Sequence, residues 1–336
     1  MKFLRKQKLI IFLAILFLLG FVGWYFVFGF RSNYPGVDFN RGTNAVWLEH
    51  KWVNTGVSED QILKLVKEFQ EKQIKYVFVH VGPLEETGLI PSDRFAGARD
   101  FLYTARQADK SIVYEAWIGQ LRSKIDLSKG WIRQNVADTS YSLIHETGFD
   151  GIHLNIEPTF DGDSEFVFLA KEIRERIGTV PLFSVAIGEL IPETVTSFLK
   201  YFKDEEEQVF GYRLDKPYNT TQFYQNLAKY VDQFAVMAYD TSIKDESLYE
   251  WFVEQQVIYV TRAVPNRQIF IGVPTYADVR DNFDPTIENM ATGLRGVIRG
   301  LNNFRSKKDA FTGVAIYSYW ETDEKEWLTY KSLWQK

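Results

Sequence analysis

Cysteine is absent from this chain of 336 residues, and histidine occurs only four times. Without cysteine, disulfides, thiolate metal sites and a cysteine nucleophile are excluded. The histidines are scattered, and the pair His145–Glu146 lacks the second histidine of a helical zinc motif. We therefore expect neither a metal ion nor another cofactor.

Positive charge is scarce beyond the amino terminus. Five of the 39 lysines and arginines lie within residues 1–31, which contain no acid, so the 44 acids dominate the rest of the chain. An acidic domain without a basic stripe is a poor match for the phosphate backbone of nucleic acids. We therefore expect no nucleic-acid partner.

One long hydrophobic run lies near the amino terminus. Residues 1–8 carry four cations, and Leu9–Phe30 is a stretch of 22 residues without a charge. At a rise of about 1.5 Å per residue, a helix of this length reaches roughly 33 Å, which is enough to span a bilayer. Because the cations precede the stretch, we expect a single-pass anchor with a cytoplasmic amino terminus.

A cleaved signal peptide is the alternative interpretation of this run. The apolar region of a signal peptide is shorter and ends at small residues, whereas this run ends in the bulky WYFVFGFR. An uncleaved anchor predicts a cytoplasmic segment 1–8, a transmembrane helix 9–30 in contact with lipid, a tether 31–42 and an extracytoplasmic domain 43–336. The lack of cysteine fits a bacterial surface protein, so we expect the plasma membrane.

Beyond the tether, apolar strand-like runs alternate with helical patterns such as residues 58–72, where Ser58 can cap a helix with one apolar face. Eight runs rich in β-branched and aromatic residues are predicted strands: Asn44–Glu49, Lys75–Val81, Ser111–Ile118, Gly151–Glu157, Pro181–Ile187, Gln233–Asp240, Gln268–Tyr276 and Gly313–Trp320. This rhythm predicts an α/β fold, a (β/α)8 TIM barrel preceded by one transmembrane helix. A doubly wound open sheet is the alternative, but no glycine-rich phosphate turn follows the first run.

The fourth run, FDGIHLNIEP at residues 149–158, carries polar residues at every second position. Side chains alternate across a strand, so His153, Asn155 and Glu157 point to one face. In such a barrel the carboxyl ends of the strands carry the site. The other strands add acidic and aromatic residues near these ends: His80, Glu115, Trp117, Glu189, Tyr239, Asp240, Tyr276, Asp278, Trp320 and Glu321. Carboxyl groups that exchange protons and flat rings that stack on sugars indicate a carbohydrate pocket.

The same stretch resembles the fourth-strand signature of glycoside hydrolase family 18, the chitinases and endo-N-acetylglucosaminidases, written Asp-Gly-x-Asp-x-Asp-x-Glu. Asp150, Gly151 and Glu157 fall on matching positions. The stretch Met237–Asp240 is similar to the family's sixth-strand Met-x-Tyr-Asp. The resemblance covers the whole domain in outline and is sharp at these two places.

The resemblance implies a retaining hydrolysis in which the substrate's own acetamido group takes the place of a second carboxylate. Glu157 would protonate the glycosidic oxygen, and the acetamido oxygen would attack the anomeric carbon. Tyr239 would hydrogen-bond the acetamido carbonyl, and Asp240 would hold the sugar. The expected partner is thus an N-acetylhexosamine glycan, and the candidate residues for binding it are His153, Trp117, Tyr276, Tyr317 and Trp320.

Two positions depart from the family signature, which has aspartate where this chain has His153 and Asn155. Asn155 can accept the hydrogen bond of the acetamido N–H, but without a charge, a loss on the order of 1–2 kcal/mol or about tenfold in rate. A protonated His153 would lower the pKa of Glu157, whereas a neutral one could relay a proton or fill the barrel floor. At the eighth strand, Tyr317 and Trp320 are both candidates for the family's platform tryptophan.

Two other functions fit the same residues. A glycosidase with two glutamates would use Asn155 and Glu157 as a distorted Asn-Glu-Pro motif, with Glu321 as the nucleophile, although the seventh strand lacks the expected glutamate. A non-catalytic barrel that binds a glycan or a partner protein would tolerate His153 and Asn155, because binding does not need the missing acids.

Overall fold

The computed structural model describes residues 20, 39–54, 56–193, 208–209, 212–213 and 218–335. The chain divides into two compact units, Met1–Val37 and Asp38–Lys336. Within the described residues, no helix has both the length and the apolar character needed to cross a membrane. The predicted segments 1–8 and 9–30 lie outside these residues except for Gly20, so both stay predictions.

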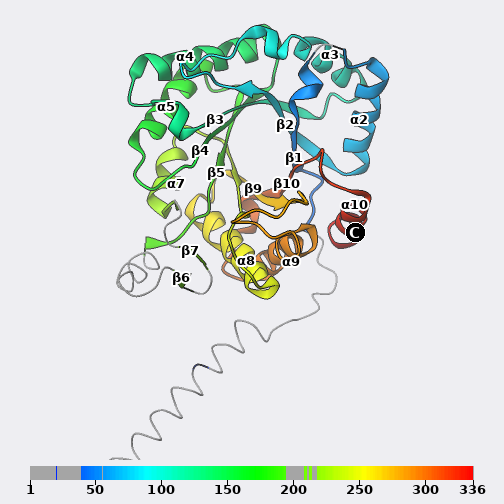
Figure 1. Cartoon of the computed structure of the whole chain (residues 1–336), viewed down its shortest axis with the longest axis vertical. Coiled ribbons are helices and arrows are strands. Elements are labelled where there is room, and N and C mark those ends of the chain that lie inside the picture. Colours follow the sequence, from blue (N-terminus) through cyan, green and yellow to red (C-terminus); the bar gives the residue numbers. More distant parts are fainter. Residues whose placement is uncertain are drawn as a thin grey trace, which may run out of the picture. The chain divides into compact units, whose positions relative to one another are not determined.

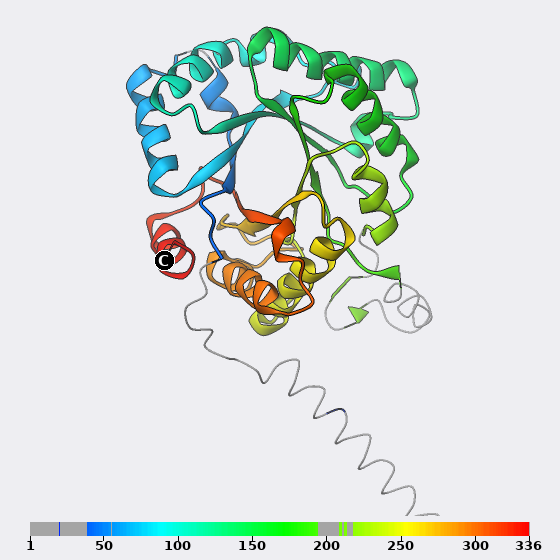
Figure 2. The same cartoon turned by 180° about the vertical axis from the view of Figure 1, so that it is seen from behind.

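Eight parallel strands close into a barrel within the unit Asp38–Lys336, which confirms the predicted TIM barrel (Figures 1 and 2). Around the barrel the strands follow the order β1-β10-β9-β8-β5-β4-β3-β2. Their bounds are β1 Asn44–Leu48, β2 Ile74–Pro83, β3 Val113–Leu121, β4 Gly151–Glu157, β5 Leu182–Ile187, β8 Gln233–Val236, β9 Gln268–Pro274 and β10 Phe311–Tyr317. A short antiparallel pair, β6 Gln208–Val209 and β7 Tyr212–Arg213, lies between β5 and β8 in the sequence.

Helices surround the strands (Figure 1). Their bounds are α2 Glu59–Glu71, α3 Ala98–Ala108, α4 Gly130–Ser142, α5 Ser164–Ile177, α7 Thr221–Leu227, α8 Glu246–Ala263, α9 Met290–Asn302 and α10 Glu324–Leu333. Helix α2 begins as its sequence predicts, because the side chains of Ser58 and Gln61 each bond the other's backbone N–H. After α10, the indole N–H of Trp334 donates to Asn44 Oδ1 at 2.8 Å, which ties the end of the chain to the first strand.

The predicted bounds match β4, whereas four predicted runs extend beyond the carboxyl end of their strand, the run Asn44–Glu49 by a single residue. The run Gln233–Asp240 ends as a strand at Val236, and further along it Asp240 has a left-handed backbone with φ 60°. The runs Gln268–Tyr276 and Gly313–Trp320 likewise end early, at Pro274 and Tyr317. The residues beyond these ends therefore lie in loops at the carboxyl side of the barrel.

Strand side chains alternate between two packing layers. In β4, Ile152, Leu154 and Ile156 belong to the large apolar cluster shared by the strands and the helices. Inward-facing residues of other strands form a second cluster: Ala45, Trp47, Tyr76, Phe78, Ala186, Ala235, Phe270 and Ala315. By the alternation of β4, its inward positions are His153, Asn155 and Glu157. This strand therefore brings polar groups into an otherwise apolar interior.

Candidate active site

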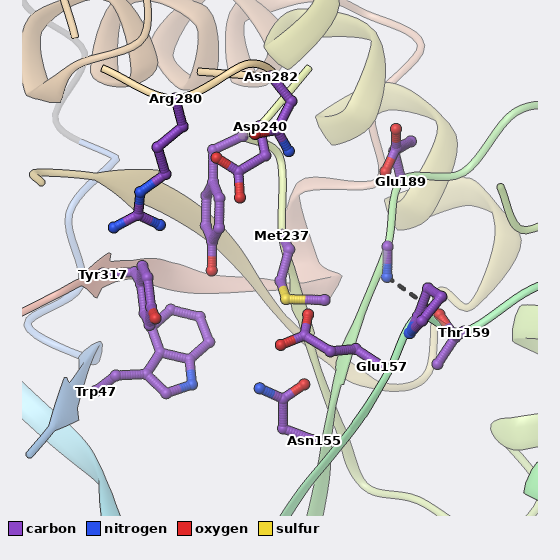
Figure 3. Close-up of a pocket in the computed structure, with 13 residues that line it drawn as sticks. Trp47, Asn155, Glu157, Thr159, Glu189, Met237, Asp240, Arg280, Asn282 and Tyr317 are labelled. Atoms are coloured by element: carbon purple, nitrogen blue, oxygen red, sulfur yellow. Dashed lines mark hydrogen bonds between the residues drawn. The ribbon is translucent and has the colours of Figure 1, made fainter. Parts of the chain in front are cut away.

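A pocket of about 300 Å³ is formed by residues at and just beyond the carboxyl ends of the strands (Figure 3). It is lined by Trp47, Asn155, Glu157, Pro158, Thr159, Gly188, Glu189, Met237, Tyr239, Asp240, Arg280, Asn282 and Tyr317. The four residues that the family resemblance assigns to catalysis, Asn155, Glu157, Tyr239 and Asp240, are all among them.

Glu157 is the last residue of β4, and its carboxyl group points into the pocket (Figure 3). Burial raises the pKa of this carboxyl, and the negative charge of Asp240 raises it further. A side-chain hydrogen bond from Asn155 acts in the opposite direction. The net shift is upward, which favours a protonated carboxyl, the form that can donate a proton.

Asn155 lies two residues before Glu157 on the same face of β4 and is 8% exposed. Its Oδ1 atom is buried, and it has no hydrogen-bond partner among the described residues. A buried carbonyl oxygen without a donor costs about 1–3 kcal/mol. The atom is thus an acceptor that a ligand N–H can satisfy.

Tyr239 and Asp240 follow β8 in the loop that bends over the mouth. Tyr239 is buried, which raises its pKa well above the usual value and keeps its hydroxyl protonated. The hydroxyl of Tyr276 donates to Asp240 Oδ1. Tyr276, only 2% exposed, therefore lies behind the pocket lining and orients Asp240.

An aromatic wall closes one side of the pocket. The ring of Tyr317 stacks on Tyr239 with centroids 5.4 Å apart and 9° between the planes. The indole of Trp47 meets Tyr317 edge to face at 5.5 Å. Trp320 is 37% exposed and is not part of the lining, but its ring lies 6.0 Å from that of Tyr317. Of the two platform candidates, the structure brings Tyr317 to the pocket and leaves Trp320 behind it.

His153 does not reach the pocket, because it is fully buried one layer below, where its ring stacks on Phe78 at 3.8 Å. The indole N–H of Trp47 donates to Nε2 of His153 at 2.9 Å. Nε2 is therefore unprotonated, and Nδ1 carries the proton that it donates to Ser184 Oγ at 2.7 Å. Burial lowers the pKa of His153 well below its usual value, so the ring is neutral.

The hydrogen bonds that run from Trp47 through His153 and Ser184 end at the carboxyl group of Glu115. Ser184 Oγ donates to Glu115 Oε2 at 2.6 Å, and Oε1 of the same carboxyl has no partner in the described part of the chain. Burial raises the pKa of Glu115 to about 8, so this carboxyl is mostly neutral at pH 7. The pocket-lining indole of Trp47 thus rests on a neutral hydrogen-bonded chain across the barrel interior.

Three other sequence candidates lie away from the pocket lining. Trp117 is half-buried, with its ring 4.6 Å from that of His80. Asp150 pairs with Arg106 at 2.8 Å and accepts from the backbone N–H of Tyr114, at the opposite end of β4 from Glu157. A Cβ on Gly151 would lie 2.3 Å from the carbonyl oxygen of the neighbouring strand β5, so only glycine fits there. Asp150 and Gly151 are thus placed to hold strands together.

The structure adds pocket residues that the sequence reasoning did not single out. Trp47 stands on a correctly predicted strand, and its alternation with Ala45 was the available signal. Arg280 and Asn282 come from the loop after β9, where no pattern in the sequence marks them. Within the described ranges, no group of three or more histidines and acids is arranged to hold a metal ion.

Comparisons with known proteins bear on the fold and on the family of the chain. No curated protein sequence matches the chain. Solved structures with the same fold include the Bacillus cereus spore cortex-lytic enzyme SleL, with 10% identity, a TM-score of 0.55 and coverage of 87% of this chain and 74% of that one. They also include the Ostrinia furnacalis Group IV chitinase, with 15% identity, a TM-score of 0.56 and coverage of 88% and 100%. A third is a Nicotiana tobaccum class V chitinase in complex with NAG4, with 12% identity, a TM-score of 0.54 and coverage of 87% and 99%.

These identities are low enough that the neighbours establish the fold alone. The family itself is established by sequence, because the profile described as Glycosyl hydrolases family 18 matches residues 124–334, more than half of the chain. That range contains Asn155, Glu157, Tyr239 and Asp240. The chain belongs to glycosyl hydrolases family 18.

Proposed function

We propose that this protein cleaves a glycan containing N-acetylhexosamine and that Glu157 is the general acid. The observation that carries the proposal is the burial of the Glu157 carboxyl in the same pocket as Asn155, Tyr239 and Asp240. Burial and the charge of Asp240 raise its pKa, which favours the protonated form that can donate a proton. The solved relatives named as chitinases support a substrate of this class.

In the proposed reaction, Glu157 gives its proton to the glycosidic oxygen as the bond from that oxygen to the anomeric carbon breaks. The carbonyl oxygen of the substrate's acetamido group forms a new bond to the anomeric carbon and replaces the departing sugar. Water then attacks the same carbon from the side of the departed sugar and returns a proton to Glu157. Two inversions at one carbon leave its configuration retained.

The neighbouring side chains fit the acetamido group from two sides. The protonated hydroxyl of Tyr239 supplies a donor for its carbonyl oxygen. The unpartnered Oδ1 of Asn155 supplies an acceptor for its N–H. Asp240, fixed by Tyr276, offers a carboxylate to sugar hydroxyls. The flat faces of Trp47 and Tyr317 give the sugar ring an apolar surface.

We also propose that the enzyme is anchored in the plasma membrane by residues 9–30, with the barrel on the outer side. The support is the uncharged run of 22 residues preceded by four cations. Labelling of a cysteine placed at position 34 with a membrane-impermeant thiol reagent tests the orientation. Labelling in intact cells is expected, and labelling only after lysis would refute it.

The test of the reaction is Glu157→Gln, compared with Glu175→Gln, an exposed glutamate on α5. We expect wild type and Glu175→Gln to cleave N-acetylglucosamine oligomers, while Glu157→Gln binds them with little or no turnover. Equal turnover by all three proteins would place the acid elsewhere, for example at Glu321. Binding without turnover by all three would favour a glycan-binding barrel, for which the uncharged His153 and Asn155 are the supporting observation.

A further inference from the structure

Among the described residues that line the pocket, Arg280 is the only cation. Its position is set by a tight turn, in which the backbone N–H of Arg280 donates to the carbonyl of Phe283 at 3.0 Å and the backbone N–H of Phe283 donates to the carbonyl of Arg280 at 3.1 Å. The guanidinium lies 4.5 Å from the ring centroid of Tyr276, a cation–π contact. This contact orients the side chain, and Arg280 as a residue remains exposed.

No carboxylate of the described residues pairs with this guanidinium. Two arginines on the outer helices are paired, since Arg133 forms an ion pair with Glu172 at 3.0 Å and Arg295 pairs with Glu250. A guanidinium presents planar donors that match two oxygens of one carboxylate. Arg280 therefore offers an unused anion-binding group inside a sugar pocket.

The position of this charge limits where an anion can bind. In Figure 3 the guanidinium points into the pocket on the side of Tyr317 and Trp47, and Glu189 lies on the opposite side. Burial raises the pKa of Tyr317 to about 12, with the nearby charge of Arg280 opposing that rise. Because Glu157 and Asp240 also act on Tyr317, an anionic group needs the positive charge of Arg280 close by to be accommodated there.

We propose that the pocket takes an acidic glycan, in which a carboxylate beside the cleaved N-acetylhexosamine pairs with Arg280. This inference rests on the proposed function, since it names the substrate class of the same pocket. Two kinds of sugar supply the chemistry: a hexosamine with a carboxylate on an ether side chain, or a uronic acid with the carboxylate on its ring. Arg280 is a specificity residue in this proposal, and the proton transfers of the reaction do not involve it.

Binding to the full-length Glu157→Gln protein separates recognition from turnover. The ligands are tetrasaccharides of N-acetylglucosamine alternating with N-acetylmuramic acid or with glucuronic acid, each as the free acid and as its methyl ester. Esterification removes the charge and leaves the sugars unchanged. The same affinities are measured after Arg280→Gln, Arg280→Lys and Arg262→Gln, the last being an exposed arginine on α8 used as the control.

We expect at least one acid to bind about tenfold more tightly than its ester, as for a charge-assisted hydrogen bond over a neutral one. Arg280→Gln removes that preference, Arg280→Lys keeps part of it, and Arg262→Gln leaves it intact. The kind of acid that shows the preference identifies the source of the carboxylate. Equal affinities for acid and ester, absence of binding, or a preference that survives Arg280→Gln would each overturn the inference.

The failure of this inference is distinguishable from the failure of the proposed function. Turnover of a neutral N-acetylglucosamine oligomer by wild type, without any acid preference, would leave the hydrolase proposal in place and remove the role of Arg280. If the protein prefers the acid in a way that depends on Arg280 but cleaves none of the glycans, the role of Arg280 stands and the hydrolase proposal fails.

Discussion

The substitution Asn155→Asp restores the residue that family 18 carries beside its catalytic glutamate. In this structure the Oδ1 of Asn155 is buried without a partner, and its side-chain amide donates to Glu157. In the proposed reaction, positive charge develops on the acetamido group, next to this position. An aspartate there would accept the same hydrogen bond and also oppose that charge.

Two effects of the substitution have calculable sizes. A charged acceptor forms a hydrogen bond about twice as strong as a neutral one, a gain of about 1–2 kcal/mol, or about tenfold in rate. The new negative charge and the lost amide donor both raise the pKa of Glu157. At about 4 Å and an effective dielectric constant of about 20, the repulsion is about 4 kcal/mol at most, equivalent to about three pKa units. The two carboxyls would then titrate as a coupled pair.

The assay is kcat/KM against pH for wild type, Asn155→Asp and Asn155→Ala on an N-acetylglucosamine oligomer. Asn155→Asp is expected to be about tenfold faster at its optimum, with its alkaline limb moved to higher pH, because Glu157 keeps its proton longer. Asn155→Ala is expected to be slower than wild type, since the acceptor is lost. An alkaline limb that moves while the optimal rate stays unchanged would refute contact between residue 155 and the acetamido group.

Three further predictions concern the barrel interior. Gly151→Ala is expected to lower the free energy of unfolding by about 3 kcal/mol, because its Cβ would lie 2.3 Å from a backbone oxygen; an unchanged urea midpoint would contradict this. His153→Phe keeps an aromatic ring in place but leaves the buried indole N–H of Trp47 without its acceptor, while Ser184 keeps its bond to Glu115, and we expect a loss of about 1–3 kcal/mol in urea unfolding and a raised KM. Glu115→Gln is expected to be stabilising by several kcal/mol at high pH and neutral at low pH. The folded pKa of Glu115 of about 8 exceeds the unfolded value, so wild-type stability falls as pH rises between the two; a gain independent of pH would contradict this assignment.

The strand–helix rhythm was sufficient to predict the barrel, because each strand is an apolar run bounded by residues that interrupt it. The same rhythm did not predict the residues at which the strands end. The run QFAVMAYD continues its apolar character past Val236, while the left-handed backbone at Asp240 turns the chain. That turn is accompanied by the hydrogen bond from Tyr276, which comes from a different strand–helix unit. The sequence pattern around Asp240 carries no information about a hydrogen-bond partner that comes from another part of the chain.

The candidate site was predictable to the extent that strand alternation defines faces. Alternation placed His153, Asn155 and Glu157 on one face, but it does not give the depth of each side chain within a closed barrel. His153 is the deepest of the three and bonds Trp47 from β1, more than a hundred residues away in sequence. Arg280 belongs to a loop, where neither period nor propensity marks a residue as facing a pocket.

The two departures from the family signature therefore have different physical consequences. His153 is neutral, and both of its ring nitrogens are engaged, by Trp47 and by Ser184. It has no free proton site with which to tune Glu157, so its contribution is to hold the indole that lines the pocket. Asn155 retains an open acceptor beside Glu157. If substitution within the signature has slowed the enzyme, the loss lies at Asn155, and restoring that one carboxylate recovers the rate while His153 stays in place.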